Sequence, residues 1–336
     1  MTLRIKISNN SSSPKYEQLC GEIIRLIESG ELKLGDKLPS IHEICHNINI
    51  ARDTVVTAYN KLKSRGIISP RHGKGFYVAS TSIRNKLKIF LLFDVMNGYK
   101  EVLFRSFTDS LGPDYQVDIF FHYYNLEVFR QLINNNLDKY GFYVIMPHFN
   151  EDVSGIVKVI PRDKMLIIDK DIKALKGDYS AIYQHFDKDI YEALCKALPS
   201  LKKYKGLKFI SNHTFQFIPE GMESGFRRFC GKHSLVQKSF DNIKSSSPTR
   251  GDAYLVVSDN DLIELIKICI RKNWALGHDI GIISYDETPL KGILAGGISV
   301  ISTDFRKMGV TAAEMIRKRQ LRKVENPSMF IQRNSL

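Results

Sequence analysis

Residues 15–78 constrain the fold more than any other stretch, because three short helical patterns are followed there by a glycine-rich basic loop between two apolar runs. The loop is His72-Gly73-Lys74-Gly75, and its glycines allow the positive φ that a tight hairpin turn requires. Three helices followed by a hairpin predict a winged helix, in which one helix enters a DNA groove and the hairpin contacts the backbone beside it. This segment therefore indicates DNA binding.

The first two helical patterns carry their own start and stop signals. Apolar residues recur at helical spacing from Leu19 to Ile27, and Ser29-Gly30 follows as a stop. Ser40 and Glu43 have the spacing of a capping box, in which the side chain of each accepts a hydrogen bond from the backbone amide of the other. A second helix is therefore predicted over residues 41–48.

The third pattern, residues 51–62, has one apolar face and one polar face. The apolar positions are Val55, Ala58, Tyr59 and Leu62, and the opposite positions are Arg52, Val56, Thr57 and Asn60. Arginine, threonine and asparagine suit base edges and phosphates. Residues 67–69 and 76–78 are the predicted hairpin strands.

Charge supports the same assignment. Residues 51–80 carry six basic side chains against one acid, a net charge of +5, whereas residues 11–50 carry four against six, a net charge of −2. Positive charge is thus concentrated on the third helix and the hairpin, where DNA phosphates would lie. A basic run alone is more often a solvated face, but here it coincides with a helix-turn-helix and a glycine hairpin.

These motifs resemble the DNA-binding domain of the GntR family of bacterial transcription regulators. The matching runs are Tyr16-Glu17-Gln18-Leu19, Ile27-Glu28-Ser29-Gly30-Glu31-Leu32, Gly35-Asp36-Lys37-Leu38-Pro39-Ser40, Arg52-Asp53-Thr54-Val55, Ala58-Tyr59, Leu62, Gly66-Ile67-Ile68 and Gly73-Lys74-Gly75-Phe76-Tyr77-Val78. The resemblance implies DNA contacts, which we assign to Ser40, Arg52, Asp53, Thr54, Thr57, His72, Gly73 and Lys74. His42 and Val56 depart from the family, in which many members carry basic residues, so contacts at these positions are not carried over. His72 can equally be an ordinary exposed turn residue.

The whole chain adds weaker constraints. Its net charge of +13 is compatible with a polyanionic partner, but the first 80 residues contribute +5 and the rest +8, so charge alone does not single out the DNA-binding segment. Five scattered cysteines without a CxxC or His/Cys cluster indicate reduced thiols and no metal site. The densest apolar run, residues 89–93, is too short to span a bilayer. We therefore expect a soluble cytoplasmic protein with no cofactor and no membrane partner.

The remainder of the chain alternates strand and helix patterns. The predicted strands are 88–94, 116–121, 142–146, 165–169, 207–211, 254–257 and 280–285, and the predicted helices are 102–111, 126–134, 187–198, 221–229, 262–272 and 305–318. This alternation predicts an α/β fold of parallel sheets covered on both faces, and its length suits two lobes. The expected domains are a winged helix over 1–79, a linker over 80–87, and a bilobed effector-binding and dimerisation domain over 88–336.

Polar residues follow several of these strands, where parallel sheets bind ligands. They are Asp94, Asp169, Ser258-Asp259-Asn260-Asp261 and Tyr285-Asp286-Glu287. A carboxylate after a strand is also a common helix cap, and Asn260 or Asp261 can serve simply as that. Both interpretations stay open at this point.

The last third of the chain resembles the effector domain of the lactose-repressor family, itself similar to periplasmic sugar-binding proteins. The matching runs are 258–262, 277–289 and 298–309. Joined to a GntR-type winged helix, this domain gives an architecture that resembles the bacterial arabinose repressors. The resemblance implies two lobes that close over a sugar held by Asp286, with Asn260 beside it, and we add Asp94 to the effector-binding candidates. The candidate rings to cover the apolar face of the sugar are Tyr99, Phe107, Tyr123 and Phe217.

One departure concerns a ligand-gripping arginine of that family, which lies three residues before the glycine matched here by Gly225. This chain has Met222 at that position. Either Arg227 or another cation replaces the arginine, or the ligand is not a typical sugar.

Together these features predict a sequence-specific transcription regulator, a repressor, that binds double-stranded operator DNA as a homodimer. Its expected effector is a sugar or sugar derivative of a carbohydrate-utilisation operon. The alternative is an α/β enzyme fused to a DNA-binding domain, but the chain has no GxSxG, GxxxxGK[ST] or HExxH motif and no complete GxGxxG motif. A nonspecific nucleoid protein, a third class, would bind all duplexes equally.

Overall fold

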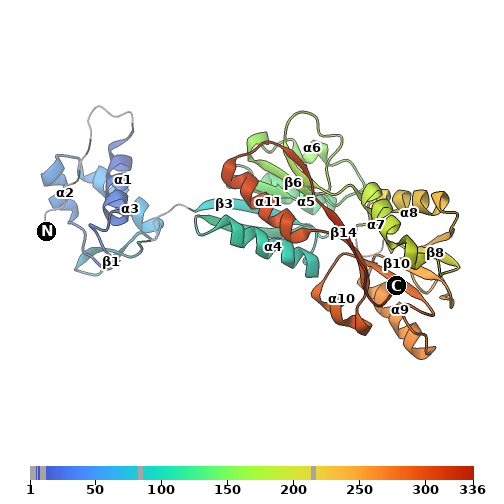
Figure 1. The fold of residues 1–336 in the computed structure, drawn as a ribbon. Helices are drawn as coiled ribbons and strands as arrows, with labels where there is room; N and C mark the ends of the chain where they lie inside the picture. The colour runs from blue at the N-terminus through green and yellow to red at the C-terminus, as the bar shows by residue number, and fades with distance from the viewer. Residues whose placement is uncertain (1–4, 6, 8–12, 82–85, 213–216) are drawn as a thin grey trace. The chain divides into compact units, whose positions relative to one another are not determined.

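The computed structural model of the protein describes residues 5, 7, 13–81, 86–212 and 217–336. The chain divides into two compact units, Met1–Asn85 and Lys86–Leu336 (Figure 1). Each unit has its own hydrophobic core and is described by itself.

The first unit is a winged helix, as the sequence predicts. Its elements are α1 (Lys15–Glu28), α2 (Ile41–Ile48), α3 (Arg52–Ser64), β1 (Ile68–Arg71) and β2 (Gly75–Val78). The strands pair antiparallel, with Ile68 opposite Val78 and Arg71 opposite Gly75. Tyr59 on α3 connects the helices to the hairpin. Its ring packs edge-on against Phe76 of β2, and its hydroxyl donates to the backbone oxygen of Pro39 at 2.6 Å.

Helix α2 begins with the predicted capping box. The amide of Glu43 donates to Ser40 Oγ at 3.1 Å, and the amide of Ser40 donates to the Glu43 carboxylate at 2.6 Å. The four apolar positions predicted on α3 are all buried in the structure. The helical patterns were sufficient here because each helix buries a single stripe against a small core.

The second unit contains two six-stranded sheets, each of which forms the centre of one lobe. The first-lobe sheet has the order β13-β7-β6-β5-β3-β4, and the second-lobe sheet has the order β14-β12-β11-β10-β8-β9. The first-lobe strands are β3 (Leu87–Phe93), β4 (Tyr115–Phe121), β5 (Phe142–Ile145), β6 (Met165–Asp169), β7 (Ser180–Tyr183) and β13 (Lys323–Glu325). The second-lobe strands are β8 (Gly206–Ile210), β9 (Val236–Phe240), β10 (Ala253–Val256), β11 (Gly281–Tyr285), β12 (Ser299–Thr303) and β14 (Ser328–Ile331). All pairs are parallel except β12 with β14 at the sheet edge.

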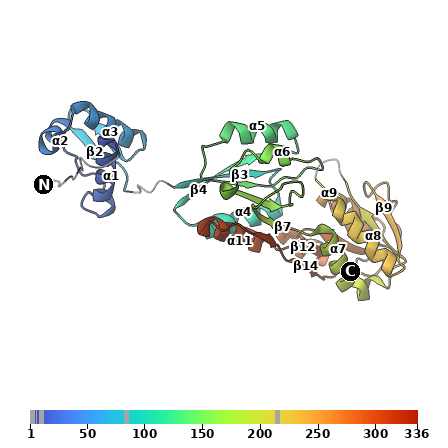
Figure 2. The ribbon, with the colours of Figure 1, turned by 90° about the horizontal axis from the view of Figure 1, so that it is seen from above.

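Helices cover both faces of each sheet. They are α4 (Gly98–Leu111), α5 (Leu126–Asn136), α6 (Ser154–Val157), α7 (Phe186–Leu201), α8 (Glu220–Lys232), α9 (Asp259–Arg271), α10 (Pro289–Ile293) and α11 (Phe305–Lys318). In the first lobe α4 and α11 lie on one face and α5 and α6 on the other (Figure 2). Strand β3 accordingly alternates, with Ile89 and Leu91 packed toward the first pair and Phe90 and Leu92 toward the second.

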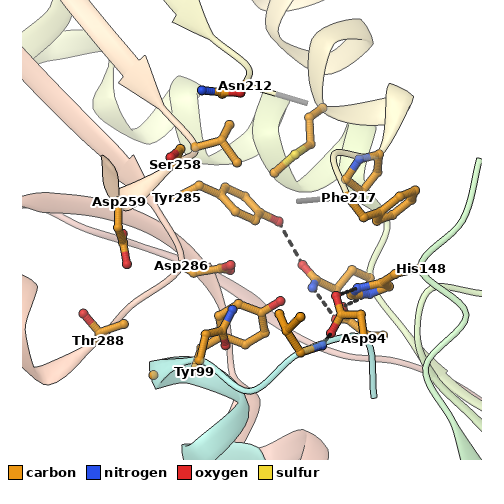
Figure 3. Close-up of a pocket in the computed structure, with 18 of the residues that line it drawn as sticks. Asp94, Tyr99, His148, Asn212, Phe217, Ser258, Asp259, Tyr285, Asp286 and Thr288 are labelled. Atoms are coloured by element: carbon orange, nitrogen blue, oxygen red, sulfur yellow. Dashed lines mark hydrogen bonds and ion pairs between the residues drawn. The ribbon is translucent and has the colours of Figure 1, made fainter. Parts of the chain in front are cut away.

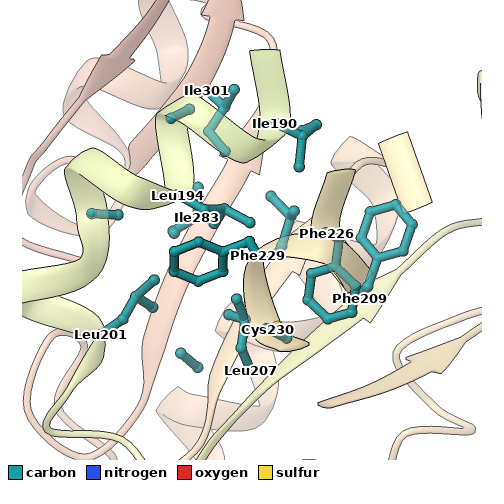
Figure 4. Close-up of a cluster of buried hydrophobic side chains, with 14 of the residues drawn as sticks. Ile190, Leu194, Leu201, Leu207, Phe209, Phe226, Phe229, Cys230, Ile283 and Ile301 are labelled. Carbon is teal, nitrogen blue, oxygen red and sulfur yellow. The ribbon is translucent and has the colours of Figure 1, made fainter. Parts of the chain in front are cut away.

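In the second lobe, α7 and α8 pack together over one face of the sheet, around Phe229 and Leu194 (Figure 4). Gly225 permits this close approach, because a Cβ at that position would overlap the backbone oxygen of Asp187 on α7. Helix α9 covers the opposite face. The second lobe is therefore a closed three-layer unit.

The chain crosses between the lobes after β7, after β12 and after β13. Asn326 links the crossing after β13 to the crossing after β12. Its side-chain amide donates to Thr303 Oγ1 at 2.7 Å and to the backbone oxygen of Asp304 at 2.9 Å. The crossings lie at the carboxyl ends of β7 and β12, and this places the connecting segments beside the polar ends of the sheets.

The predicted strands and helices are all present, displaced by a few residues at most at their ends except at α4, which starts four residues before the predicted 102. Strands β7, β9, β12, β13 and β14 and the short helices α6 and α10 were not predicted from the sequence. Strands β13 and β14 are three and four residues long and only partly buried, so they are too short for a hydrophobic pattern to identify them, and β9 is largely exposed. Among the described residues no helix is both long and apolar enough to cross a membrane.

Candidate functional site

A cavity of about 260 Å³ lies between the two lobes of the second unit (Figure 3). It is lined by the carboxyl ends of strands from both sheets, as expected for ligand sites of parallel sheets. All three predicted effector-binding residues, Asp94, Asn260 and Asp286, line it. A role for these residues in binding remains a prediction.

The first-lobe side of the cavity is a buried charge network. His148 lies between two carboxylates, with its Nδ1 2.8 Å from Asp94 Oδ2 and its Nε2 2.7 Å from Asp169 Oδ2. Asp94 is also bonded by the buried ammonium of Lys100. Burial opposes charge on the imidazole, but the two carboxylates raise the pKa of His148 above its ordinary value. Burial likewise acts to raise the pKa of Asp94, but His148 and Lys100 hold it well below its ordinary value.

This network continues into the second lobe. The side-chain amide of Gln184 donates to Asp169 Oδ1 at 2.5 Å, and its oxygen accepts from the hydroxyl of Tyr285 at 2.9 Å. Gln184 follows β7 in the first lobe, whereas Tyr285 ends β11 in the second. The contact therefore joins the two lobes at the floor of the cavity.

Asp286 is the next residue and differs from the other carboxylates. Its Oδ1 is buried and has no hydrogen-bond partner among the described residues. Burial, the largest effect, raises the pKa of Asp286 to about 7, despite the opposing influence of Lys291. The backbone of Asp286 is left-handed, with φ 62°, a conformation that aspartate and asparagine tolerate better than most residues.

Lys291 supplies positive charge beside this carboxyl without bonding to it. Its Nζ donates to the backbone oxygens of Tyr285 and Asp286 at 2.7 and 2.8 Å and pairs with Asp259 Oδ1 at 2.8 Å. Lys291 is buried, whereas Asp259 is exposed. The lysine thus fixes the loop after β11, and its charge is directed to main-chain oxygens and to Asp259.

The helix-cap alternative is wrong for Asn260 and Asp261. The side chain that caps α9 is Ser258, which accepts from the amide of Asn260 at 3.2 Å. Asp261 instead accepts from the amide of Ile243 at 2.8 Å and so fixes the loop after β9. Asn260 is exposed and lines the cavity.

The aromatic candidates divide into two groups. Tyr99 and Phe217 line the cavity, and the Phe217 ring stacks on the His148 ring with centroids 5.0 Å apart. Phe107 lies in the core under α4, and Tyr123 is exposed outside the cavity lining, so neither is a ligand-covering ring. The sequence alone could not separate Phe107 and Tyr123 from Tyr99 and Phe217, because hydrophobic periodicity does not show which aromatic side chain faces the gap between the lobes.

Of the alternatives left open at Met222, the replacement of the family arginine by Arg227 is wrong. Arg227 is exposed, pairs with Glu223 at 2.7 Å and does not line the cavity. Met222 is buried at the cavity wall. Among the described residues, the lysine or arginine that lines the cavity is Lys291, which was not among the residues predicted from the sequence.

The hydrogen-bonded network of Lys100, His148, Gln184 and Tyr285 with the two carboxylates was not predicted from the sequence. The sequence marks these residues only weakly. His148 and Gln184 follow strands without belonging to a recognisable motif, and Lys100 lies inside a helix, where a lysine is usually expected to be exposed. Among the described residues, no group of histidine, cysteine and acidic side chains is arranged to hold a metal ion.

The predicted DNA-contacting residues lie on the surface of the first unit. Arg52, Asp53 and Thr57 are exposed on α3, Thr54 is half-buried, and the hairpin turn exposes His72, Gly73 and Lys74. Gly73 and Gly75 have φ of 69° and 98°, as the turn prediction requires. The Thr57 hydroxyl donates to the backbone oxygen of Asp53 at 2.7 Å, and Ser40 Oγ accepts from Glu43, so each hydroxyl already has one bond. Their contacts with DNA stay predictions.

Two parts of the chain match known families. Residues 15–78 match the family described as bacterial regulatory proteins, gntR family, and residues 202–334 match the periplasmic binding protein-like domain. The HTH-type transcriptional repressor YtrA of Bacillus subtilis (strain 168) is 38% identical over 78 residues, which are 23% of this chain and 60% of that protein. The uncharacterized HTH-type transcriptional regulator YhcF of the same organism is 32% identical over 90 residues, 26% of this chain and 74% of that protein.

The Arabinose metabolism transcriptional repressor of Geobacillus stearothermophilus is 38% identical over 66 residues, which are 20% of this chain and 18% of that protein. The chain thus spans less than two thirds of YtrA and of this repressor. Among solved structures, the trehalose repressor from Escherichia coli superposes with a TM-score of 0.63 at 10% identity, covering 74% of this chain and all (100%) of that one. A LacI family transcriptional regulator from Lactobacillus casei with bound glucose gives 0.60 at 16% identity, covering 74% and 99%. These likenesses confirm the fold predicted for the second unit.

Proposed function

The chain belongs to the gntR family of bacterial regulatory proteins, and from this premise we propose that it is a sequence-specific DNA-binding repressor controlled by a sugar-like effector. The winged helix would bind the operator, and the cavity between the lobes would bind the effector. We propose Ser40, Arg52, Asp53, Thr54, Thr57, His72, Gly73 and Lys74 as DNA-contacting residues. Asp94, Asn260 and Asp286 are the proposed effector-binding residues.

One observation carries the effector half of this proposal. The cavity holds a buried carboxylate oxygen, Asp286 Oδ1, with no partner in the described part of the chain. An unpaired buried acceptor is costly, and a ligand that donates to it recovers the missing bond. Sugars present adjacent hydroxyl donors beside an apolar ring face, and the cavity adds the rings of Tyr99 and Phe217.

The DNA-binding half rests on the exposed polar end of α3. Arg52 lies in its first turn and has no ion-pair partner among the described residues. An arginine so placed can contact a guanine edge or a phosphate. The relatives matched by this segment are named as transcription regulators, which supports a regulator over the alternative of a fused enzyme.

We propose a homodimer because the DNA-contacting surface of one winged helix is small. One short recognition helix buries too little surface for tight operator binding, and two copies on a palindrome double the contacts. Helix α9 offers a surface for this assembly, because Ile263 and Ile270 are exposed two turns apart on the same side of the helix. Lys291 connects α10 to the start of α9, and α10 exposes Leu290 and Ile293 as well. We propose that a second copy of the chain covers these side chains.

The test is binding of the full-length protein to operator DNA with and without sugars. Genomic fragments selected by the protein should compete far better than unrelated duplexes at about 150 mM salt, because salt screens the phosphate contacts common to all DNA. A bound sugar should change the operator affinity, since ligand and DNA affinities are coupled reciprocally. Equal affinity for every duplex would favour a nonspecific nucleoid protein and refute the proposal.

A further inference from the structure

The charges that surround the cavity do not balance. The carboxylates are those of Asp94, Asp169, Asp259 and Asp286, and the cations bonded to them or facing them are Lys100, His148 and Lys291. With every group ionised, four negative charges face three positive ones. A net charge of −1 therefore remains among these groups.

The excess charge belongs to Asp286. Asp94 is bonded by Lys100 and His148, Asp169 by His148 and Gln184, and Asp259 by Lys291. Asp286 alone among the four has a buried oxygen without a partner in the described residues. The groups that act on its charge are Lys100, Asp169, Asp259 and Lys291, and each of them is already paired.

The surroundings of this carboxyl suit a cation. In Figure 3 the Asp286 carboxyl is seen between the rings of Tyr99 and Tyr285, and Tyr124 also lines the cavity. Phe217 is not counted here, because its ring stacks on His148 and already has the ammonium of Lys170 over it. Aromatic faces attract ammonium groups, and a buried carboxylate needs a charged partner more than a neutral donor, because an uncompensated charge in a low-dielectric site is costly. The same arrangement disfavours phosphorylated or acidic sugars, since their charge would add to the excess.

We propose that the effector is a polyol carrying one protonated amine, such as an amino sugar, and that its ammonium group pairs with Asp286. The inference rests on the proposed function and narrows its ligand class. The hydroxyl groups of the ligand would meet Asn260 and the other polar groups of the wall, and its amine would supply the missing positive charge. Binding would draw Asp286 fully into its ionised form, because an ammonium beside it lowers its pKa.

The test compares matched ligands on the full-length protein by calorimetry and thermal shift at pH 7.5. The amines are D-glucosamine, D-galactosamine, D-mannosamine and 6-amino-6-deoxy-D-glucose. Each is paired with its parent hexose, which has a hydroxyl in place of the amine and is the control of matched size, and the 2-amino sugars also with their N-acetyl derivatives, which lose the charge but gain an acetyl group. We expect at least one amine to bind tenfold or more tighter than its parent and its N-acetyl form.

Two variants assign the effect to the carboxyl. Asp286→Asn keeps the shape of the side chain and should abolish the preference for the amine over its parent. Asp178→Asn removes an exposed carboxylate outside the cavity lining and should leave the preference unchanged. A preference that persists in Asp286→Asn would overturn the assignment.

The remaining outcomes separate this inference from the proposed function. Parent sugars that bind as well as the amines, or a panel in which no amine binds, would overturn the amine inference. If neutral sugars then change operator affinity, the sugar-controlled repressor stands with a different ligand class. If the protein binds no operator selectively, the proposed function fails whatever the cavity binds.

Discussion

Asp286→Asn should stabilise the second unit at neutral and alkaline pH, although it removes the residue proposed to bind the effector. Asparagine has the size of aspartate, tolerates the left-handed backbone of this position and carries no charge that burial could penalise. The wild-type carboxyl has no partner for its buried Oδ1 in the described residues. The substitution therefore removes an unfavourable charge while keeping the packing.

The magnitude follows from the pKa. Burial raises the pKa of Asp286 from its ordinary value of 3.8 to about 7, and each pKa unit corresponds to about 1.4 kcal/mol. The raised pKa means that the folded state holds its proton more tightly than the unfolded state. The contribution of this group to the free energy of unfolding is therefore fully present below about pH 4. It is lost as the pH rises to about 7, and the total loss is about 4 kcal/mol at most. Partial solvent access to the residue reduces the expected value to about 2–4 kcal/mol.

The measurement is urea unfolding of wild type and variant between pH 4.5 and pH 8. The free energy gained by Asp286→Asn should be small at the lowest pH, increase through the interval and level off above about pH 7.5. The matched control is Asp94→Asn, for which we expect a change in the free energy of unfolding of the opposite sign. His148 and Lys100 hold the pKa of Asp94 below its ordinary value despite its burial. That variant should be destabilised by about 3–5 kcal/mol at neutral pH, since it leaves Lys100 buried without its carboxylate. A pH-independent effect of Asp286→Asn, or a loss of stability at pH 8, would refute the reasoning.

Three further predictions concern the other parts of the molecule. Arg52→Ala should weaken operator binding by about 1–3 kcal/mol if Arg52 contacts a base, as measured by fluorescence anisotropy, and unchanged affinity would remove it from the interface. Gly309→Ala should destabilise the second unit by about 1–3 kcal/mol or more in thermal unfolding, because a Cβ on α11 would be 2.5 Å from the backbone oxygen of Leu103 on α4. Ile270→Asp should dissociate the proposed dimer in analytical ultracentrifugation, whereas Val236→Asp, at a similarly exposed apolar position on β9, should not; equal sedimentation of the two variants would place the dimer contact elsewhere.

The sequence predicted those parts of the fold that depend on local pattern. The capping box of Ser40 and Glu43 and the buried face of α3 could be identified because each depends on neighbours within one or two turns. Short edge strands such as β13 could not, because their pairing partners lie more than a hundred residues away and three residues are too few for a polar/apolar alternation to be distinguished from chance.

The candidate site was predicted in the same uneven way. Asp94 and Asp286 were selected because they follow strong strands, and both line the cavity. The pairing of His148 with two carboxylates and the neutralisation of Asp94 by Lys100 required the tertiary structure. Arg227 was a wrong substitute because its position on α8 directs it to Glu223 and solvent instead of the cavity.

The position of Asp286 next to Tyr285 suggests how ligand binding is converted into movement of the lobes. The hydroxyl of Tyr285 bonds Gln184 of the first lobe, and Gly98 of the first lobe lies so close to Thr288 that a Cβ there would be 3.1 Å from the threonine methyl. The loop after β11 therefore touches the opposite lobe on both sides of the unpaired carboxyl. A ligand that neutralises Asp286 acts on the segment that holds the lobes together, and any difference in its affinity for the open and closed arrangements shifts the balance between them. The charge of one side chain and the closure of the cavity are thus expected to change together.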